Sequence, residues 1–231
     1  MRTRIKVCGL TRESDVDAAV AAGVDAVGFV FYAASPRAVS ASQARALVRR
    51  LPAWVSAVGL FVNAPRDTIL RVANEAGLSH IQLHGDESPA DCQGLGRPVI
   101  KAIRVKTGLT PAASGAEADR VAQLVQDFSD CQAVLFDADS AGFGGSGQAF
   151  DWSILSRAFA KAPALRATWV LSGGLESGSV GQAIAAIAPP CVDVSSGVEV
   201  IQGGSTVKGV KDAQRIAQFV AAVNAVDQAA S

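Results

Sequence analysis

The chain has 231 residues, of which 49% are apolar and 18% are charged, so it can bury a large core. Lys plus Arg and Asp plus Glu number 21 each, which excludes a broad electrostatic attraction to nucleic acid or to an anionic membrane. The sequence lacks an apolar stretch long enough to cross a bilayer and the apolar region of a signal peptide. The four widely separated cysteines, which contain no CxxC pair, are Cys8, Cys92, Cys131 and Cys191. We therefore expect a soluble protein of the reducing cytoplasm, without disulfides and without a metal site.

Short apolar runs rich in β-branched residues recur along the chain, and each precedes a longer helix-like segment. The predicted strands, in chain order, are Arg4–Cys8, Ala26–Phe31, Val55–Phe61, His80–Leu83, Val99–Ile103, Ala133–Asp137, Thr168–Leu171 and Cys191–Val194. Their continuous apolar character is typical of strands that are covered on both faces. Helical periodicity is clearest in Ser14–Ala22, Ser42–Leu51, Asp67–Ala76 and Ala213–Val223.

The alternation of eight strands with helices predicts an α/β fold with a parallel sheet and right-handed crossovers. Eight such units in a chain of this length favour a closed (β/α)8 TIM barrel over a doubly wound sheet. Because no proline- or serine-rich linker divides the chain, we expect a single domain over residues 1–231, with a frayed tail at 226–231. Pro111–Glu117, which is rich in small residues, is expected to form an irregular start to the fifth helix.

Two residues at predicted strand ends could carry acid–base chemistry, because a barrel of this kind places function at the carboxyl ends of its strands. Cys8 ends the first strand, where a thiolate could act as a base or a nucleophile. The alternative is an inert buried thiol, which we assign to the other three cysteines. Asp137 ends an apolar strand, where desolvation would raise its pKa and suit a general acid. Asp139 is its rival, and a loop cap is the alternative role.

Three glycine-rich segments follow the last three predicted strands. They are Gly144-Gly145-Ser146-Gly147, Ser172-Gly173-Gly174 and Ser195-Ser196-Gly197. Glycine lets backbone N–H groups approach a phosphate closely, and we expect a short helix beginning at Val198 to direct its positive end there. Each glycine could instead serve only a tight turn, but three such segments on one rim favour phosphate binding.

Arg37 and His84 follow the second and fourth predicted strands. The guanidinium of Arg37 could bind a carboxylate with two hydrogen bonds, although a solvated surface arginine is the simpler interpretation. His84 could act as a base, or it could be a loop histidine bonded to a neighbour. Asp86 and Glu87 are expected to start the next helix.

Several motifs occur together and in order along the chain. They are Lys6-Val7-Cys8-Gly9-Leu10-Thr11, Gly28-Phe29-Val30-Phe31, Ser35-Pro36-Arg37, Val62-Asn63, Gln82-Leu83-His84-Gly85, Gly144-Gly145-Ser146-Gly147, Phe150-Asp151-Trp152, Asp193-Val194-Ser195-Ser196-Gly197-Val198-Glu199 and Lys211-Asp212. Over nearly its whole length the sequence thereby resembles the phosphoribosylanthranilate isomerase family. Two features depart from that pattern: Ser179 stands where asparagine is usual, and the run 202–206 before Lys211 matches the family's sequence less closely.

The resemblance implies roles for individual residues. Cys8 would be the general base, Asp137 the general acid, and Arg37 the contact for the anthranilate carboxylate, with His84 in the substrate site. Phosphate would bind backbone amides near Gly145, Gly147, Gly174, Ser196 and Gly197. The implied reaction is an Amadori rearrangement in tryptophan biosynthesis that needs no metal or organic cofactor. The implied partner is a phosphorylated small molecule, with no nucleic acid or membrane, and the protein would be a monomer or a homodimer.

Three other functions are alternatives for such a barrel, and sequence features distinguish each of them from the implied isomerase. A related isomerase of histidine biosynthesis uses a carboxylate where Cys8 stands. Indole-3-glycerol-phosphate synthase would need a catalytic lysine set and a longer amino-terminal extension. A non-catalytic phosphosugar-binding barrel would keep the glycine segments without a reason to keep Cys8 and Asp137 together, so their joint presence favours an enzyme.

Overall fold

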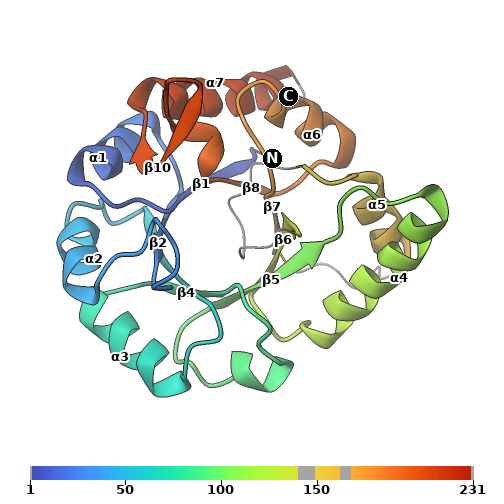
Figure 1. Ribbon diagram of the computed structural model, residues 1–231, viewed down its shortest axis with the longest axis horizontal. Coiled ribbons are helices and arrows are strands. Elements are labelled where there is room, and N and C mark those ends of the chain that lie inside the picture. The colour runs from blue at the N-terminus through green and yellow to red at the C-terminus, as the bar shows by residue number, and fades with distance from the viewer. Residues whose placement is uncertain (1, 140–148, 162–167, 230–231) are drawn as a thin grey trace.

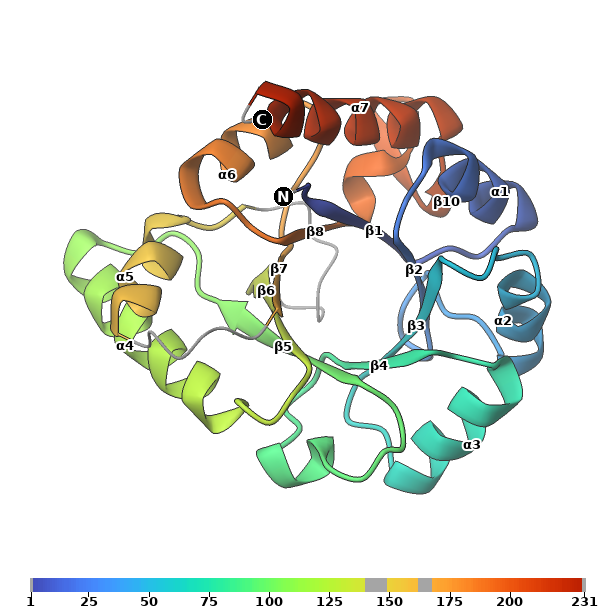
Figure 2. The same ribbon diagram turned by 180° about the vertical axis from the view of Figure 1, so that it is seen from behind.

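The computed structural model describes residues 2–139, 149–161 and 168–229, and its centre is a closed barrel of eight parallel strands (Figures 1 and 2). The strands are β1 (Arg4–Cys8), β2 (Ala26–Val30), β3 (Ser56–Phe61), β4 (His80–Leu83), β5 (Val99–Val105), β6 (Ala133–Ala138), β7 (Thr168–Leu171) and β8 (Cys191–Val194). Parallel pairing of β1 with β8 closes the barrel. The predicted barrel is confirmed, and every predicted strand is present to within two residues at either end.

A layer of helices surrounds the barrel (Figures 1 and 2). The helices are α1 (Glu13–Ala22), α2 (Ala41–Val48), α3 (Arg66–Ala76), α4 (Pro111–Asp127), α5 (Ser153–Lys161), α6 (Val180–Ile187) and α7 (Ala213–Ala229). Helix α4 is regular from its first residue, so the predicted irregular start is wrong. Thr110 caps it by accepting a hydrogen bond from the Ala113 amide, and Pro111 occupies a first-turn position that needs no N–H donor.

The connection between β4 and β5 contains a single turn of 3-10 helix, η1 (Pro89–Cys92), in place of an α-helix. Asp86 and Glu87 precede this turn and do not start it. The Glu87 carboxylate is buried and accepts hydrogen bonds from the backbone amides of Asn63 and Gly85 and from Lys101. The expected helix start is therefore wrong, and Glu87 instead joins the turns that follow β3 and β4.

The barrel interior is filled by side chains from alternate strand positions. A cluster of inward-facing residues lies across it, formed by Val58, Ile100, Ala102, Ala133, Leu135 and Val170. Cys8, Val30, Leu60 and Val62 pack together in a second, smaller cluster. Because side chains alternate along a strand, Asp137 faces inward like Leu135, two residues before it.

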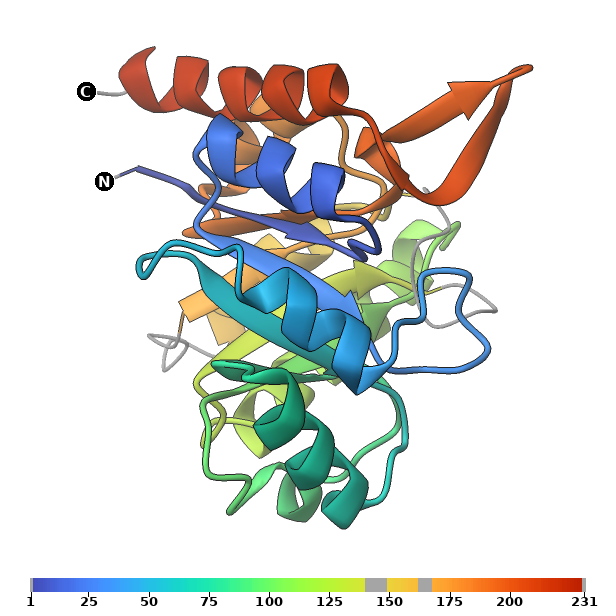
Figure 3. The same ribbon diagram turned by 90° about the vertical axis from the view of Figure 1, so that its left-hand side faces the viewer.

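After β8 the chain forms one turn of 3-10 helix, η2 (Ser196–Val198), and then an antiparallel hairpin of β9 (Glu199–Gln202) and β10 (Ser205–Lys211). The expected helix beginning at Val198 is therefore wrong. Gly203 and Gly204, with φ of 59° and 78°, form the two-residue turn that joins the strands, and such turns favour hairpins over helices. The hairpin projects beyond the barrel on the side opposite the termini (Figure 3).

Helix α7 continues to Ala229, so the expected fraying is wrong for residues 226–229. The reason is a contact between the chain ends: the Asp227 carboxylate accepts hydrogen bonds from the Thr3 amide (2.6 Å) and the Thr3 hydroxyl (2.8 Å). Among the helices in the described ranges, none combines the length and the apolar character that crossing a membrane requires.

Candidate active site

Cys8 ends β1 with its thiol buried inside the barrel mouth, above a buried ion pair. The Lys6 ammonium, also on β1, lies 2.9 Å from the Asp193 carboxylate on β8, and both side chains are nearly inaccessible to solvent. Burial opposes the charged form of Lys6, but Asp193 and the Cys8 thiol outweigh it and raise the pKa of Lys6. The ion pair therefore keeps a cation next to the thiol.

Burial raises the pKa of the Cys8 thiol, and the Lys6 ammonium offsets only part of this. The net shift of the pKa of the Cys8 thiol is therefore upward. Gly28, the register partner of Cys8 on β2, leaves the thiol its space, because a Cβ there would lie 2.6 Å from the sulfur.

Asp137 ends the inward face of β6 and is held by a chain of buried polar side chains. Its Oδ2 lies 3.2 Å from His84 Nε2, and His84 Nδ1 lies 2.9 Å from Gln82 Nε2. Asp137 Oδ1 accepts a hydrogen bond from the Ala138 amide. The turn after β7 packs closely here, since a Cβ on Gly173 would lie 3.3 Å from Asp137 Oδ1. The structure thus brings the predicted residues His84 and Asp137 into direct contact.

Asp139 is the first residue after β6, whereas Asp137 lies within that strand. Asp139 is half-buried, its amide donates to the Val105 carbonyl, and its charge acts on Arg120 of α4. Asp193, by contrast, lies within electrostatic reach of Lys6, Asp137 and His84 together. The ends of β1, β4, β6 and β8 therefore present one acid–base cluster at the barrel mouth.

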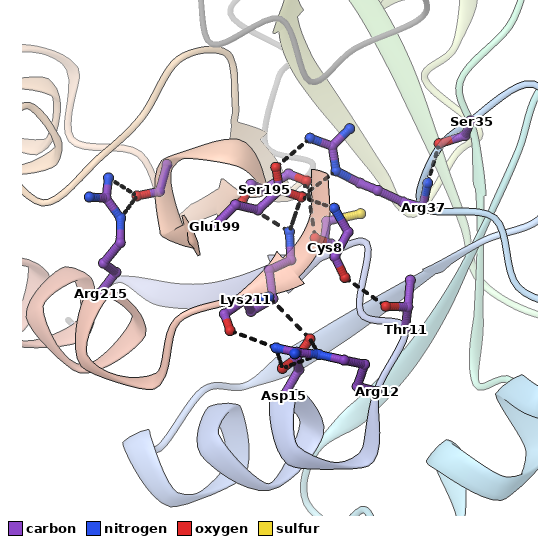
Figure 4. Close-up of polar contacts among 12 residues, drawn as sticks. Cys8, Thr11, Arg12, Asp15, Ser35, Arg37, Ser195, Glu199, Lys211 and Arg215 are labelled. Carbon is purple, nitrogen blue, oxygen red and sulfur yellow. Dashed lines mark hydrogen bonds and ion pairs between the residues drawn. The ribbon is translucent and has the colours of Figure 1, made fainter. Parts of the chain in front are cut away.

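Arg37 belongs to a buried charged network at the base of the hairpin (Figure 4). Its Nε and Nη2 donate to the two oxygens of Glu199 at 2.6 and 2.8 Å. Lys211 Nζ donates to Glu199 (3.1 Å) and to the Ser195 carbonyl (3.0 Å), and the Ser195 hydroxyl donates to the Cys8 carbonyl (3.1 Å). The network joins the loop after β2 to the ends of β1 and β8.

A cavity of about 350 Å³ opens beside this network. It is lined by Arg37, Gly174, Leu175, Glu176, Ser196, Gly197, Glu199, Ile201, Thr206, Lys208 and Arg215. The turns after β7 and β8 meet here so closely that a Cβ on Gly197 would lie 2.0 Å from the Leu175 carbonyl oxygen. Of the predicted phosphate contacts, Gly174, Ser196 and Gly197 line this cavity, whereas Gly145 and Gly147 lie outside the described residues.

Reasoning from sequence missed four charged residues of this site. Asp193, Glu199 and Lys211 fall within matched motifs without an assigned role, and Glu87 was expected only to start a helix. The available signal was a charged residue at the inward parity of an otherwise apolar strand, as Asp193 is within Cys191–Val194. Over the described ranges, no group of three or more His, Cys, Asp or Glu side chains is arranged to hold a metal ion.

Comparison with known proteins agrees with this geometry. The family model of N-(5'-phosphoribosyl)anthranilate (PRA) isomerase matches residues 5–222. The N-(5'-phosphoribosyl)anthranilate isomerase of Methylibium petroleiphilum is 48% identical over 98% of this chain and 96% of its own length. That of Dechloromonas aromatica is 46% identical over 99% of both chains.

Solved structures give the same result for the fold. The phosphoribosylanthranilate isomerase of Thermotoga maritima has a TM-score of 0.81 and 36% identity, covering 96% of this chain and 99% of its own. A second structure, determined with reduced 1-(o-carboxyphenylamino)-1-deoxyribulose 5-phosphate, has a TM-score of 0.78 and 34% identity over 96% of this chain and 99% of its own. The chain belongs to the N-(5'-phosphoribosyl)anthranilate isomerase family.

Proposed function

We propose that Asp137 and Cys8 are the acid and base with which this isomerase converts N-(5'-phosphoribosyl)anthranilate into 1-(o-carboxyphenylamino)-1-deoxyribulose 5-phosphate, in tryptophan biosynthesis. The observation that carries this assignment is the placement of these two side chains. An inward-facing carboxyl group is the second-last residue of β6 and an inward-facing thiol is the last residue of β1, at the same end of the barrel. A carboxyl group with a histidine neighbour can donate a proton, and a thiol with an ammonium neighbour can become a thiolate.

The first step is ring opening at Asp137. Its carboxyl proton passes to the furanose ring oxygen, the bond between that oxygen and C1 breaks, and the nitrogen lone pair forms the C1=N bond of an iminium ion. His84, 3.2 Å away, orients the carboxyl group and supports the carboxylate that remains.

The second step is proton abstraction by Cys8. The thiolate takes the proton from C2, the electrons of that bond form a C1=C2 double bond, and the C1=N electrons return to nitrogen. The resulting enol becomes the ketone when C1 gains a proton and the C2 hydroxyl loses one. Burial destabilises the thiolate, and the positive charge of Lys6 offsets part of this effect.

Substrate binding uses the neighbouring network and cavity. Arg37 donates to Glu199 through Nε and Nη2, so Nη1 is the group that we assign to the anthranilate carboxylate. The amides of Gly174, Ser196 and Gly197, which have no acceptor among the described residues, are assigned to the phosphate. The related structure solved with the reduced product analogue supports a phosphorylated ligand of this size.

We also propose that the chain is one domain, acts in the cytoplasm as a monomer or a homodimer, and has no nucleic-acid or membrane partner. The balanced charge supports the last point. One related structure is of monomers generated from the dimeric Thermotoga maritima enzyme, so relatives of this fold exist in both states. Sedimentation of the purified protein at several concentrations distinguishes them.

The direct test of the function is turnover of freshly prepared phosphoribosylanthranilate, followed by the loss of its fluorescence. We expect turnover by the wild-type protein and almost none by Asp137→Asn or Cys8→Ala. The aminoaldose substrate of the histidine-pathway isomerase is the specificity control and should not be converted. Tight binding of phosphoribosylanthranilate without turnover would instead support a non-catalytic phosphosugar-binding barrel.

A further inference from the structure

One face of the β9–β10 hairpin is directed at the substrate cavity. Glu199 and Ile201 have the same parity on β9, Thr206 is paired with Ile201 on β10, and Lys208 lies in the stretch between Thr206 and Lys211 where the register of the hairpin shifts. All four residues line the cavity, which the turns after β7 and β8 bound elsewhere. The hairpin is therefore a wall of the site, although it stands outside the eight strand–helix units of the barrel.

Lys208 is the charged residue on this wall that has no ionic partner among the described residues. It is exposed to solvent at the cavity and makes no hydrogen bond or ion pair with a described residue. Glu199, in contrast, is fully buried and is already bonded to Arg37 and Lys211. The ammonium of Lys208 is thus available to an anion in the cavity.

The backbone beside Lys208 is fixed, although the hairpin tip is exposed. The Gly209 amide donates to Glu199 (2.9 Å), and the Gly209 carbonyl accepts from the Thr11 hydroxyl (2.6 Å). Gly209 has φ of +82°, and a Cβ there would lie 3.1 Å from the Pro36 carbonyl oxygen. Lys208 therefore extends from the anchored base of the hairpin, so that its position relative to the cavity is set by the barrel.

Two features of the cavity favour a phosphate over a carboxylate as the anion. The amides of Gly174, Ser196 and Gly197 have no acceptor among the described residues, and several N–H donors match the several oxygens of a phosphate. Arg215 donates through Nε and Nη2 to the Gly197 carbonyl, which holds that peptide in place and adds a second cation to the lining. The anthranilate carboxylate already has Arg37.

We propose that Lys208 binds the 5'-phosphate of the substrate, so that the β9–β10 hairpin forms part of the phosphate subsite. This inference rests on the proposed function, since it takes the substrate to be a phosphorylated sugar. Lys208 supplies a point charge that complements the directional N–H groups of the turns. Its contribution is expected in substrate binding, and the chemical step at Cys8 and Asp137 should proceed without it.

The test compares Lys208→Met with Lys161→Met, which removes the same charge from an exposed residue of α5 that pairs with Asp119. Inorganic phosphate and anthranilate serve as separate inhibitors of the isomerase reaction. For Lys208→Met we expect the inhibition constant of phosphate and the KM of the substrate to rise about five- to twentyfold, with kcat nearly unchanged. Anthranilate inhibition should not change, Lys161→Met should resemble the wild type, and Lys208→Arg should recover most of the binding.

A second readout separates this inference from the proposed function. Inorganic phosphate should raise the melting temperature of the wild-type protein and raise it less for Lys208→Met, which requires no turnover. Equal stabilisation of the two proteins by phosphate would overturn the role of Lys208, whatever the activity. A loss confined to anthranilate inhibition would also overturn it, because Lys208 would then serve the carboxylate.

Discussion

The side chains of Arg37 and Glu199 form a bidentate ion pair that is almost completely closed to solvent, with exposed fractions of 7% and 0%. The pair joins the loop after β2 to the first residue of the hairpin, 162 positions away in the sequence. Because Nε and Nη2 are both engaged, the plane of the guanidinium is fixed before any substrate arrives. Arg37 is thus preorganised, and Glu199 is the residue that orients it.

Glu199→Gln should therefore cost stability as well as substrate binding. Arg37 and Lys211 would lose their counter-charge in a buried setting, which typically destabilises a protein by about 3–5 kcal/mol. Denaturant unfolding at pH 7 measures this free energy. Glu13→Gln, which removes an exposed carboxylate paired with Arg50, is the matched control and should cost little. Equal losses in the two variants would contradict the assignment.

The stability that Glu199 contributes should depend on pH in a definite direction. Although burial opposes its charged form, the hydrogen bond from Arg37 and the charge of Lys211 lower the pKa of Glu199. A lowered pKa contributes stability that is fully present above the ordinary glutamate pKa of about 4.3 and is lost as pH falls through the folded-state value. The difference in unfolding free energy between wild type and Glu199→Gln should shrink in acid. A constant difference from pH 7 to pH 3 would refute this.

Asp137→Asn and Cys8→Ala should each lower kcat by about 10²–10⁴-fold, as expected when a general acid or base is lost. Asp139→Asn should have a much smaller effect, because its side chain is near Arg120 and not in the acid–base cluster. Steady-state kinetics of the three variants gives the comparison. A larger loss in Asp139→Asn than in Asp137→Asn would reverse the acid assignment.

His84→Asn removes the contact to Asp137, and we expect kcat to fall about ten- to a hundredfold through misplacement of the acid. The KM should change less than kcat. His80→Asn is a useful control, since His80 begins β4, the strand that leads to His84, but contacts Ser79. If the two variants have the same kcat and the same KM, His84 does not position Asp137.

The pH dependence of kcat/KM should reflect the thiol. The reaction needs the thiolate, and burial raises the pKa of Cys8 above the ordinary thiol value of about 8.5, so activity should still be rising at mildly alkaline pH. Lys6→Met removes a charge that lowers this pKa and should move the rise to higher pH. Circular dichroism must show that the variant is folded. An unmoved profile in folded Lys6→Met would mean that Lys6 does not act on the thiol.

In a thiol-labelling experiment, protection by a bound ligand should distinguish Cys8 from the other cysteines more clearly than the labelling rates do. A hydrogen bond from Cys92 lowers the pKa of Cys131, and burial raises that of Cys191 to about 12. Cys131 therefore competes with Cys8 for iodoacetamide, but it lines a different cavity, beside the start of β5, which shares no residue with the substrate cavity. Product or substrate analogue should protect Cys8 alone. Protection of Cys131 as well, or of neither, would refute the placement of the ligand.

The barrel could be predicted from the sequence because each strand is a local apolar run. Side chains alternate between the two faces of a strand, so the sequence also indicates which of them point inward, as Leu135 and Asp137 do. The hairpin could not be predicted in the same way. Gly203-Gly204 signals a two-residue turn, but the glycine-rich segment just before it equally suits a phosphate-binding helix, which is the structure we expected there. The partners of Arg37 and His84 depend on contacts across 162 and 53 positions, which only the closed barrel defines.

The contact between Thr3 and Asp227 bears on how the chain could be rearranged. Because these residues lie within hydrogen-bond distance, a short peptide could join the two ends of the described chain without disturbing β1 or α7. New ends could then be opened in the exposed turn before β3, near Trp54, giving a circular permutant with the same barrel. In the unpermuted chain both ends lie on the side opposite the hairpin (Figure 3), so a protein fused to either of them would stand clear of the substrate's path.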